Sequence, residues 1–177
     1  MVALYNVIEG IRGFIELGGN VLWAIMFVLL IMWTLIIERY WYLFQVLPGQ
    51  KRDVIEAWDA RSDHRSWHAH QIKAEMVSAV RQDLRRNVLT IQTLVAICPL
   101  LGLLGTVTGM VAVFDVMAFF GTGNARAMAA GVSQATIPTM AGMVAALSGV
   151  YFASHLDRKV DAEAGKLEDQ LQHERVE

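Results

Sequence analysis

The sequence has little charge for its length. Asp, Glu, Lys and Arg make up 18% of the 177 residues, and all four are absent from residues 17–37, 87–114 and 127–156. These runs are 21, 28 and 30 residues long, whereas a helix needs about 20 apolar residues to cross a hydrocarbon core of roughly 30 Å. A soluble domain would alternate charge more evenly. The pattern therefore predicts three membrane spans, the last two long enough to tilt or project beyond the bilayer.

Cysteine is also scarce, and few basic residues precede the first charge-free run. Cys98 is the only cysteine, which excludes a disulfide within the chain and favours a small buried apolar side chain. Glu9 and Glu16 precede the first run, where a signal peptide would carry basic residues. The run also lacks a clear small-residue cleavage site. We therefore interpret it as a retained span.

Basic residues are distributed unevenly between the connecting segments. There are nine Lys/Arg in 38–90 and four in 157–177, but only Arg12 before the first span and Arg126 in the loop 115–126. Lys and Arg concentrate in cytoplasmic segments. We therefore expect 38–90 and 157–177 in the cytoplasm, with the N-terminus and the loop on the other side.

Hydrophobic spacing predicts helices beyond the spans. The first sixteen residues carry apolar side chains at helical spacing, which indicates an amphipathic helix on the outer membrane surface. Pro48-Gly49 predicts a break, followed by a short helix over 54–61. The expected order is an amphipathic helix (1–16), a first span (17–37), a cytoplasmic segment (38–90), a second span (91–114), a loop (115–126), a third span (127–156) and a helical cytoplasmic tail (157–177).

The second and third spans are expected to extend into the cytoplasm as helices. Apolar residues recur at steps of four from Met76 to Val88, which predicts one unbroken helix entering the second span. The tail carries a stripe formed by Val160, Ala164, Leu167 and Leu171. This stripe is compatible both with packing inside one subunit and with a contact between subunits.

Small residues mark the predicted packing faces. Spanning helices associate through close packing of small residues and through interhelical hydrogen bonds, since lipid is as apolar as their side chains. Gly105 and Gly109 form a G-x-x-x-G pair in the second span. In the third span a small stripe is formed by Ala141, Ala145, Gly149 and Ala153. We expect this stripe to need a close neighbour, which favours an oligomeric all-α bundle.

Polar groups and prolines interrupt the same two spans. Thr106 lies in the second, and Ser133, Gln134, Thr136 and Thr139 lie in the third. Pro99 and Pro138 each remove a helical hydrogen bond, and freed carbonyls inside a membrane need water, a hydroxyl or a neighbouring helix. The paired pattern predicts a wetted interior surface. The alternative is that each threonine bonds back to its own helix.

Carboxylates are missing where a proton pathway would need them. Such pathways normally contain an ionisable residue within the membrane, but no Asp, Glu, Lys or Arg lies within a span, and Asp115 is at the outer end of the second. If the chain lines a proton path, the titrating carboxylate must come from another polypeptide.

Two motifs carry a family resemblance. CPLLGLLGTVTGM (98–110) and GVSQATIPTMAGMVAALSGVYF (131–152) resemble the second-span and third-span motifs of the MotA/TolQ/ExbB proton-channel family. The layout of three spans is closer to ExbB and TolQ than to the four-span MotA-like proteins. The short cytoplasmic segment is similar to the compact ExbB type, which serves TonB-like energy transduction.

The resemblance implies a multi-pass protein of the bacterial inner membrane, with a periplasmic N-terminus and a cytoplasmic C-terminus. Five such subunits would surround a dimer of single-span ExbD-like partners within the membrane lipids and energise a TonB-like protein. Thr106 and Thr139 align with family threonines that face the partner's membrane aspartate, and Thr136 and Gln134 would line the same path. Many family members have Glu where this chain has Gln134, so a proton relay at that position is in doubt.

Other functions fit the sequence less well. TolQ-like service in envelope integrity and a scaffold without conduction remain open, whereas the missing carboxylate argues against a channel formed by this chain alone. An enzyme or metal site would rest on His64, His68 and His70, which lack a third ligand type nearby. We expect no enzymatic activity, no cofactor, no metal and no nucleic-acid partner.

Overall fold

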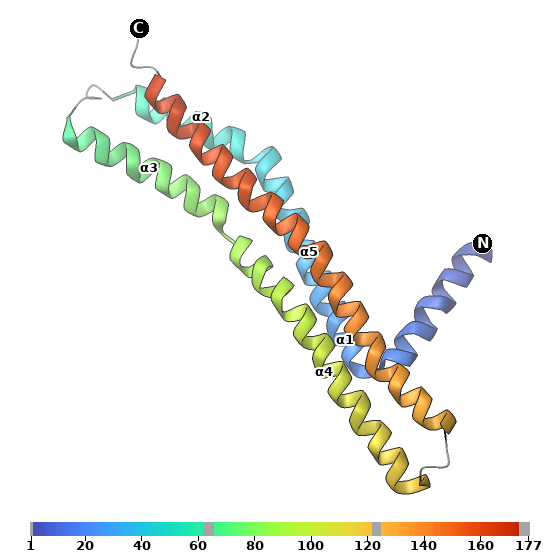
Figure 1. Ribbon diagram of the computed structural model, residues 1–177. Coiled ribbons are helices and arrows are strands. Elements are labelled where there is room, and N and C mark those ends of the chain that lie inside the picture. Colours follow the sequence, from blue (N-terminus) through green and yellow to red (C-terminus); the bar gives the residue numbers. More distant parts are fainter. Residues whose placement is uncertain (1, 62–65, 122–124, 174–177) are drawn as a thin grey trace. The chain divides into compact units, whose positions relative to one another are not determined.

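The computed structural model describes residues 2–61, 66–121 and 125–173, and within them every regular element is a helix (Figure 1). Three helical stretches are long and apolar enough to cross a membrane: Gly18–Gln45, Trp67–Phe119 and Met128–Leu171. The sequence prediction of an all-α membrane protein with three spanning helices is confirmed. The five helices are α1 (Val2–Gln45), α2 (Leu47–Asp59), α3 (Trp67–Arg85), α4 (Val88–Phe120) and α5 (Ala125–His173).

Helix α1 contains both the predicted N-terminal helix and the first span. The two parts are separated at Gly19, whose φ of 67° and ψ of −166° are not helical and are adopted almost only by glycine. The first span then continues to Gln45, beyond the predicted end at residue 37. The side chains of Leu4, Ile8, Ile11 and Ile15, which suggested the amphipathic face, lie outside the described residues.

The expected break at Pro48-Gly49 is misplaced. Helix α2 begins at Leu47 rather than near residue 54, with Pro48 in its first turn. Proline is tolerated there because the first amide groups of a helix have no intrahelical acceptor. The interruption between α1 and α2 is therefore confined to Val46, whose φ of −90° and ψ of −41° remain in the right-handed helical region.

The prediction of one unbroken helix into the second span is wrong. Helix α3 begins after Ser66, whose hydroxyl accepts the Ala69 amide at 3.1 Å, and it ends at Arg85. Arg86 has ψ of 139°, and Asn87 has φ of 65° before α4 begins. Asparagine tolerates this left-handed conformation better than most residues. The apolar spacing continues from α3 into α4, so it gives no indication of the break.

The helices form two compact units. The first, which we call the apolar unit, contains Met1–Trp33 and Gln92–Val150, and the second, the charged unit, contains Thr34–Ile91 and Tyr151–Glu177. Ile25, Cys98, Ala145 and Ala146 form a core cluster in the apolar unit. In the charged unit the tail stripe is buried, with Val160, Ala164 and Leu167 fully so. The tail stripe therefore packs inside one subunit.

Ion pairs join the helices of the charged unit. Lys51 of α2 donates to the Glu163 carboxylate of α5 at 2.5 Å, and Lys166 donates to the same carboxylate at 2.7 Å. Arg85 of α3 pairs with Asp161 of α5 at 2.9 Å. The Lys51 and Glu163 side chains are 15% and 21% exposed, whereas those of Arg85 and Asp161 are about half exposed. Exposed pairs contribute little, so the Lys51–Glu163 pair is the one expected to matter.

Replacing Lys51 with Met should lower the stability of the charged unit by about 1 kcal/mol, because one hydrogen bond of a partly buried carboxylate is lost. Thermal unfolding of the purified protein in mild detergent measures this. Arg52→Met is the control, since Arg52 is an exposed residue of the same helix. Equal effects of the two substitutions would assign no stabilising role to the ion pair.

Candidate functional site

The candidate site is the contact between α4 and α5 in the apolar unit, where the two family-like motifs meet. A Cβ atom added to Gly102 would lie 2.9 Å from the Thr139 Cα, and one added to Gly109 would lie 2.5 Å from the Ala135 Cα. One added to Gly142 would lie 2.6 Å from the Cys98 carbonyl oxygen. The contacting pairs run in opposite directions along the two sequences, so α4 and α5 are antiparallel (Figure 1). Their backbones approach too closely for any residue but glycine at these three positions.

At Gly105, α4 contacts α1 as well as α5. A Cβ there would meet the Pro138 ring, with its Cγ at 2.9 Å, and the Val21 side chain of α1 at 3.6 Å. Pro138 is buried, and both Pro99 and Pro138 lie inside continuous helices. The predicted irregularity at the prolines therefore does not end either helix. Instead, Pro138 fills the space that Gly105 leaves.

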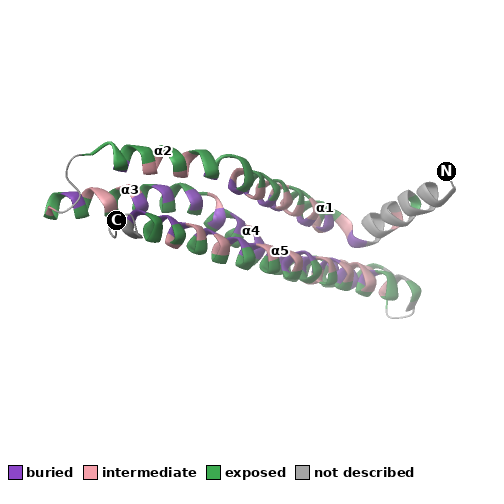
Figure 2. Ribbon diagram, turned by 90° about the horizontal axis from the view of Figure 1, so that it is seen from above, coloured by how far each residue is buried: buried purple, intermediate pink, exposed green. Residues whose placement is uncertain are grey.

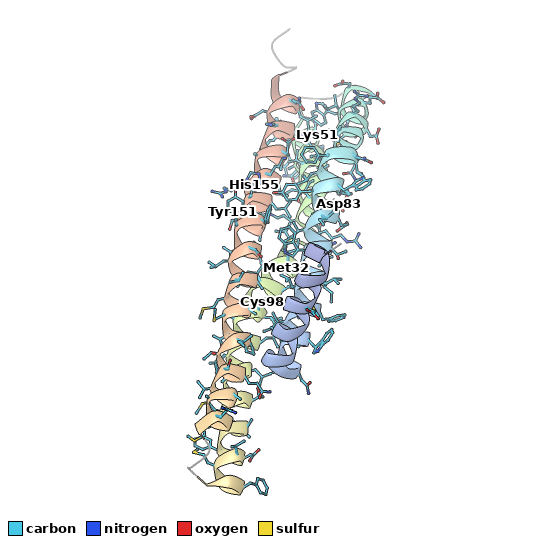
Figure 3. The ribbon with its side chains drawn as sticks, turned by 90° about the vertical axis from the view of Figure 1, so that its right-hand side faces the viewer. Met32, Lys51, Asp83, Cys98, Tyr151 and His155 are labelled. Carbon is cyan, nitrogen blue, oxygen red and sulfur yellow. The ribbon has the colours of Figure 1, made fainter. Side chains whose placement is uncertain are left out.

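The small stripe of the third span is also satisfied within the chain. A Cβ on Gly149 would meet Val95 Cγ2 at 2.5 Å and Met32 Sδ at 2.6 Å, and Ala145 belongs to the core cluster with Cys98. Figure 3 labels Met32 and Cys98 in this part of the molecule. Ala141 is half-buried, and Ala153 is buried in the charged unit. The close neighbours of Ala145 and Gly149 are therefore in the same subunit, so the stripe gives no support to an oligomer.

The threonine hydroxyls have two kinds of partner. Thr106 donates to the Leu103 carbonyl at 2.6 Å and Thr136 donates to the Ser133 carbonyl at 3.2 Å, both within their own helices. Thr139 instead donates across to the Gly102 carbonyl of α4 at 2.9 Å. A hydroxyl that donates one hydrogen bond still has acceptor lone pairs. Thr106 and Thr136 thus bond back to their own helices, whereas Thr139 forms a hydrogen bond between α5 and α4.

Gln134 lies apart from the predicted threonine lining. Its Nε2 atom would be 2.8 Å from a Cβ added to Gly19, the non-helical residue of α1. Gly18 is close as well, because a Cβ there would meet Ile137 at 3.3 Å. The structure therefore places the Gln134 amide against α1, whereas Thr139 contacts α4.

In the apolar unit, many residues on the outward sides of α4 and α5 are exposed (Figure 2), and most of these are apolar. Thr136 is exposed between Val132 and Met140, one turn away on either side. Leu103 and Val107 are exposed on α4, and Thr106 between them is half-buried. Thr106 and Thr136, together with the exposed Thr93 and Thr108 of α4, are thus hydroxyl-bearing residues that a second polypeptide or lipid could meet on a mostly apolar surface.

The predicted third span also contains one histidine. His155 lies at the end of the predicted third span and is exposed; its ring stacks on Tyr40 with centroids 6.3 Å apart and planes 10° apart. Figure 3 labels His155 beside Tyr151 on α5. No group of three metal-ligating side chains occurs in the part of the chain that the structure describes. Of the histidine cluster, His68 and His70 lie on α3, and His64 falls outside the described residues.

The close contacts of Gly18, Gly19, Gly131 and Gly142 were not predicted from the sequence. A Cβ on Gly131 would meet Val113 Cγ2 at 2.5 Å. Gly131, Ala135 and Gly142, Ala146 repeat the four-residue spacing of small residues that identified the other stripe. The same spacing on a second face of the third span could therefore have predicted Gly131 and Gly142.

Replacing Gly109 with Ala should destabilise the apolar unit by roughly 1–3 kcal/mol, the usual cost of overpacking. The added methyl would meet the Ala135 backbone, which cannot rotate away as a side chain can. The melting temperature in detergent measures the effect. Gly165→Ala is the matched control on α5, because nothing lies within 4 Å of the added atom, and helix propensity favours Ala. A Gly109→Ala protein as stable as the parent would contradict the close contact.

Comparison with known proteins identifies the family. The MotA/TolQ/ExbB proton channel family matches residues 51–169, which is more than half of the chain and includes both motifs. Two proteins of Synechocystis sp. named as biopolymer transport proteins, ExbB-like 1 and ExbB-like 3, are 42% and 37% identical over 67 and 73 residues. These segments cover 36% and 40% of this chain but only 26% and 35% of the relatives. The chain belongs to the MotA/TolQ/ExbB proton channel family.

Proposed function

We propose that the chain is an ExbB-like subunit of a proton-driven complex in the bacterial inner membrane, which energises a TonB-like protein for uptake across the outer membrane. The observation that carries the proposal is the direct contact between the two family-like motifs, where Thr139 of α5 bonds to the Gly102 carbonyl of α4. Family membership and the three helices able to span a membrane support the same function.

The proposed complex needs partners for the chemistry. Asp, Glu, Lys and Arg are absent from the three charge-free runs, and proton pathways normally use an ionisable group in the membrane. We propose that an ExbD-like single-span protein supplies an aspartate and that five copies of this chain surround it. The distribution of Lys and Arg favours a periplasmic N-terminus and a cytoplasmic C-terminus.

In this proposal the chain holds its two hydroxyl-bearing helices rigidly and offers hydrogen bonds to the partner. The Thr106 hydroxyl is already oriented by its hydrogen bond to the Leu103 carbonyl. The lone pairs of this hydroxyl can accept a hydrogen bond from a protonated carboxyl group or from water. Thr139 keeps α4 and α5 in register. Each proton that crosses supplies about 2.3 kcal/mol per 100 mV, so several protons suffice for a conformational change of a few kcal/mol.

Replacing Thr106 with Val should reduce proton-driven uptake by roughly ten-fold, since an unpaired polar group in a dry site costs about 1–3 kcal/mol and 1.36 kcal/mol corresponds to a factor of ten in rate. Energy-dependent uptake by cells, with the abundance of the complex measured in parallel, tests this. Thr106→Ser keeps the hydroxyl and should retain function.

Thr108→Val is the second control for this experiment. Thr108 also donates within its own helix, to the Gly105 carbonyl at 3.0 Å, but it points roughly 200° away from Thr106 around the helix. Thr139→Val removes a bond between helices and should therefore lower both stability and uptake, with Thr139→Ser restoring both. If cells carrying Thr106→Val and cells carrying Thr139→Val both take up substrate at the rate of the parent, these threonines serve only in packing.

The chain alone should conduct protons poorly, because no Asp, Glu, Lys or Arg lies within its charge-free runs. Reconstitution in liposomes containing a pH-sensitive dye measures the flux, first with the chain alone and then with an ExbD-like partner. The expected result is conduction only in the second case. Equal flux would contradict the assignment of the titrating group to the partner, and no flux in either case would favour a scaffold.

A further inference from the structure

Arg39 is the only charged side chain that is buried in the described part of the chain, at 3% exposure. It lies on α1 just after the first charge-free run. Its Nε donates to the Arg86 carbonyl at 2.5 Å and its Nη2 donates to the Asp83 carbonyl at 2.7 Å. The guanidinium also lies 4.9 Å from the centre of the Tyr42 ring. Its hydrogen bonds thus go to the backbone of the charged unit.

The two carbonyls belong to the end of α3. The last four carbonyls of a helix have no intrahelical donor and carry the negative end of its dipole. A guanidinium suits this position because its planar fork can reach two acceptors at once and always carries a positive charge. A residue of α1 therefore caps the C-terminus of α3.

The neighbouring residue holds the other side of the break. Asn87, the left-handed residue between α3 and α4, donates its side-chain amide to the Glu38 carboxylate at 3.2 Å. The Asn87 carbonyl then accepts the Ile91 amide at 2.9 Å, the first hydrogen bond of α4. Two consecutive residues of α1, Glu38 and Arg39, thus contact both sides of the break, and we call them the α1 clamp.

The local sequence favours a helix through this position. Leu84 and Val88 are both buried and continue the apolar spacing of α3 into α4, and neither proline nor glycine occurs between residues 80 and 95. In an unbroken helix the Asp83 carbonyl would find an intrahelical donor. In the broken form, Arg39 of the α1 clamp instead donates to the carbonyls of Asp83 and Arg86. A cavity of about 360 Å³, lined by Glu38, Arg39, Tyr42, Asp83, Arg86 and Asn87, lies beside it.

We propose that Arg39 is a positioning residue, which holds the α3–α4 break through the α1 clamp and so sets how α3 joins the helix that carries Gly102 and Thr106. The role in transport rests on the function proposed above, whereas the role at the break does not. The break is the point from which α4, continuous from Val88 to Phe120, begins.

The break can be measured directly with spin labels at Ser78→Cys on α3 and Thr90→Cys on α4, in a Cys98→Ala background. Both label positions are exposed. The parent should give one narrow distance distribution by pulsed electron resonance. Arg39→Met removes both donors and should shift or broaden the distribution, and Arg39→Lys, which can reach one carbonyl, should have an intermediate effect. Arg81→Met, at an exposed residue of α3, should leave the distribution unchanged.

A distribution in Arg39→Met that matches the parent would overturn the proposal. If that variant cannot be purified, Arg39→Lys decides in the same way: a parental distribution refutes the clamp and an altered one supports it. Asn87→Gly separates the two contacts, because it keeps the left-handed backbone accessible but loses the bond to Glu38. It should alter the distribution less than Arg39→Met.

Proton flux tests the positioning role. Membrane vesicles from cells carrying each variant at its own locus are assayed with a pH-sensitive dye, and the amount of the chain is measured in parallel. Arg39→Met loses both hydrogen bonds of a charged group and should lower the flux per chain at least about ten-fold, and Arg39→Lys should restore part of it. An altered distance with parental flux would overturn the positioning role. Absence of flux in the parent would instead refute the proposed function and leave the clamp at the break standing.

Discussion

The packing of the apolar unit depends on the absence of three Cβ atoms. Inside a bilayer, helices gain little from burying apolar surface, so their association depends on how closely they can approach. At Gly102, Gly109 and Gly142 the backbones of α4 and α5 are too close for any side chain. This proximity brings the Thr139 hydroxyl within reach of the Gly102 carbonyl. The polar contact therefore follows from the steric one.

The two units rely on different forces. In the apolar unit, the helices meet at close glycine contacts and at the Thr139 hydroxyl bond, and Ile25 and Met32 are buried beside Cys98 and Ala145. In the charged unit, fully buried aliphatic residues of α5 are supplemented by ion pairs to α2 and α3. Water is the solvent that makes aliphatic burial favourable. The change in composition along α5, from glycine and alanine to leucine and charge, agrees with a change of surroundings along one helix.

Features that depend on local composition could be predicted from the sequence. The three spans followed from the missing charges, and the Gly105 and Gly109 positions followed from their spacing. The break at Asn87 could not be predicted, because it is held by a residue distant in sequence: Arg39, which donates to the Arg86 carbonyl, lies 47 residues before it. Likewise, the position of Gln134 beside Gly19 depends on how α1 and α5 pack. Spacing identifies which residues share a face, but not which helix that face meets.

The contact between Gly19 and Gln134 has a consequence for the variation that this chain tolerates. The side chain at 134 lies where any side chain at position 19 would have to go, but shortening it would remove only the steric half of the restriction. The backbone of residue 19, at φ of 67° and ψ of −166°, remains accessible almost only to glycine. Relatives with this bend should therefore keep glycine at the position of Gly19 whatever side chain stands at the position of Gln134. A relative that replaces the glycine should have a straight first helix.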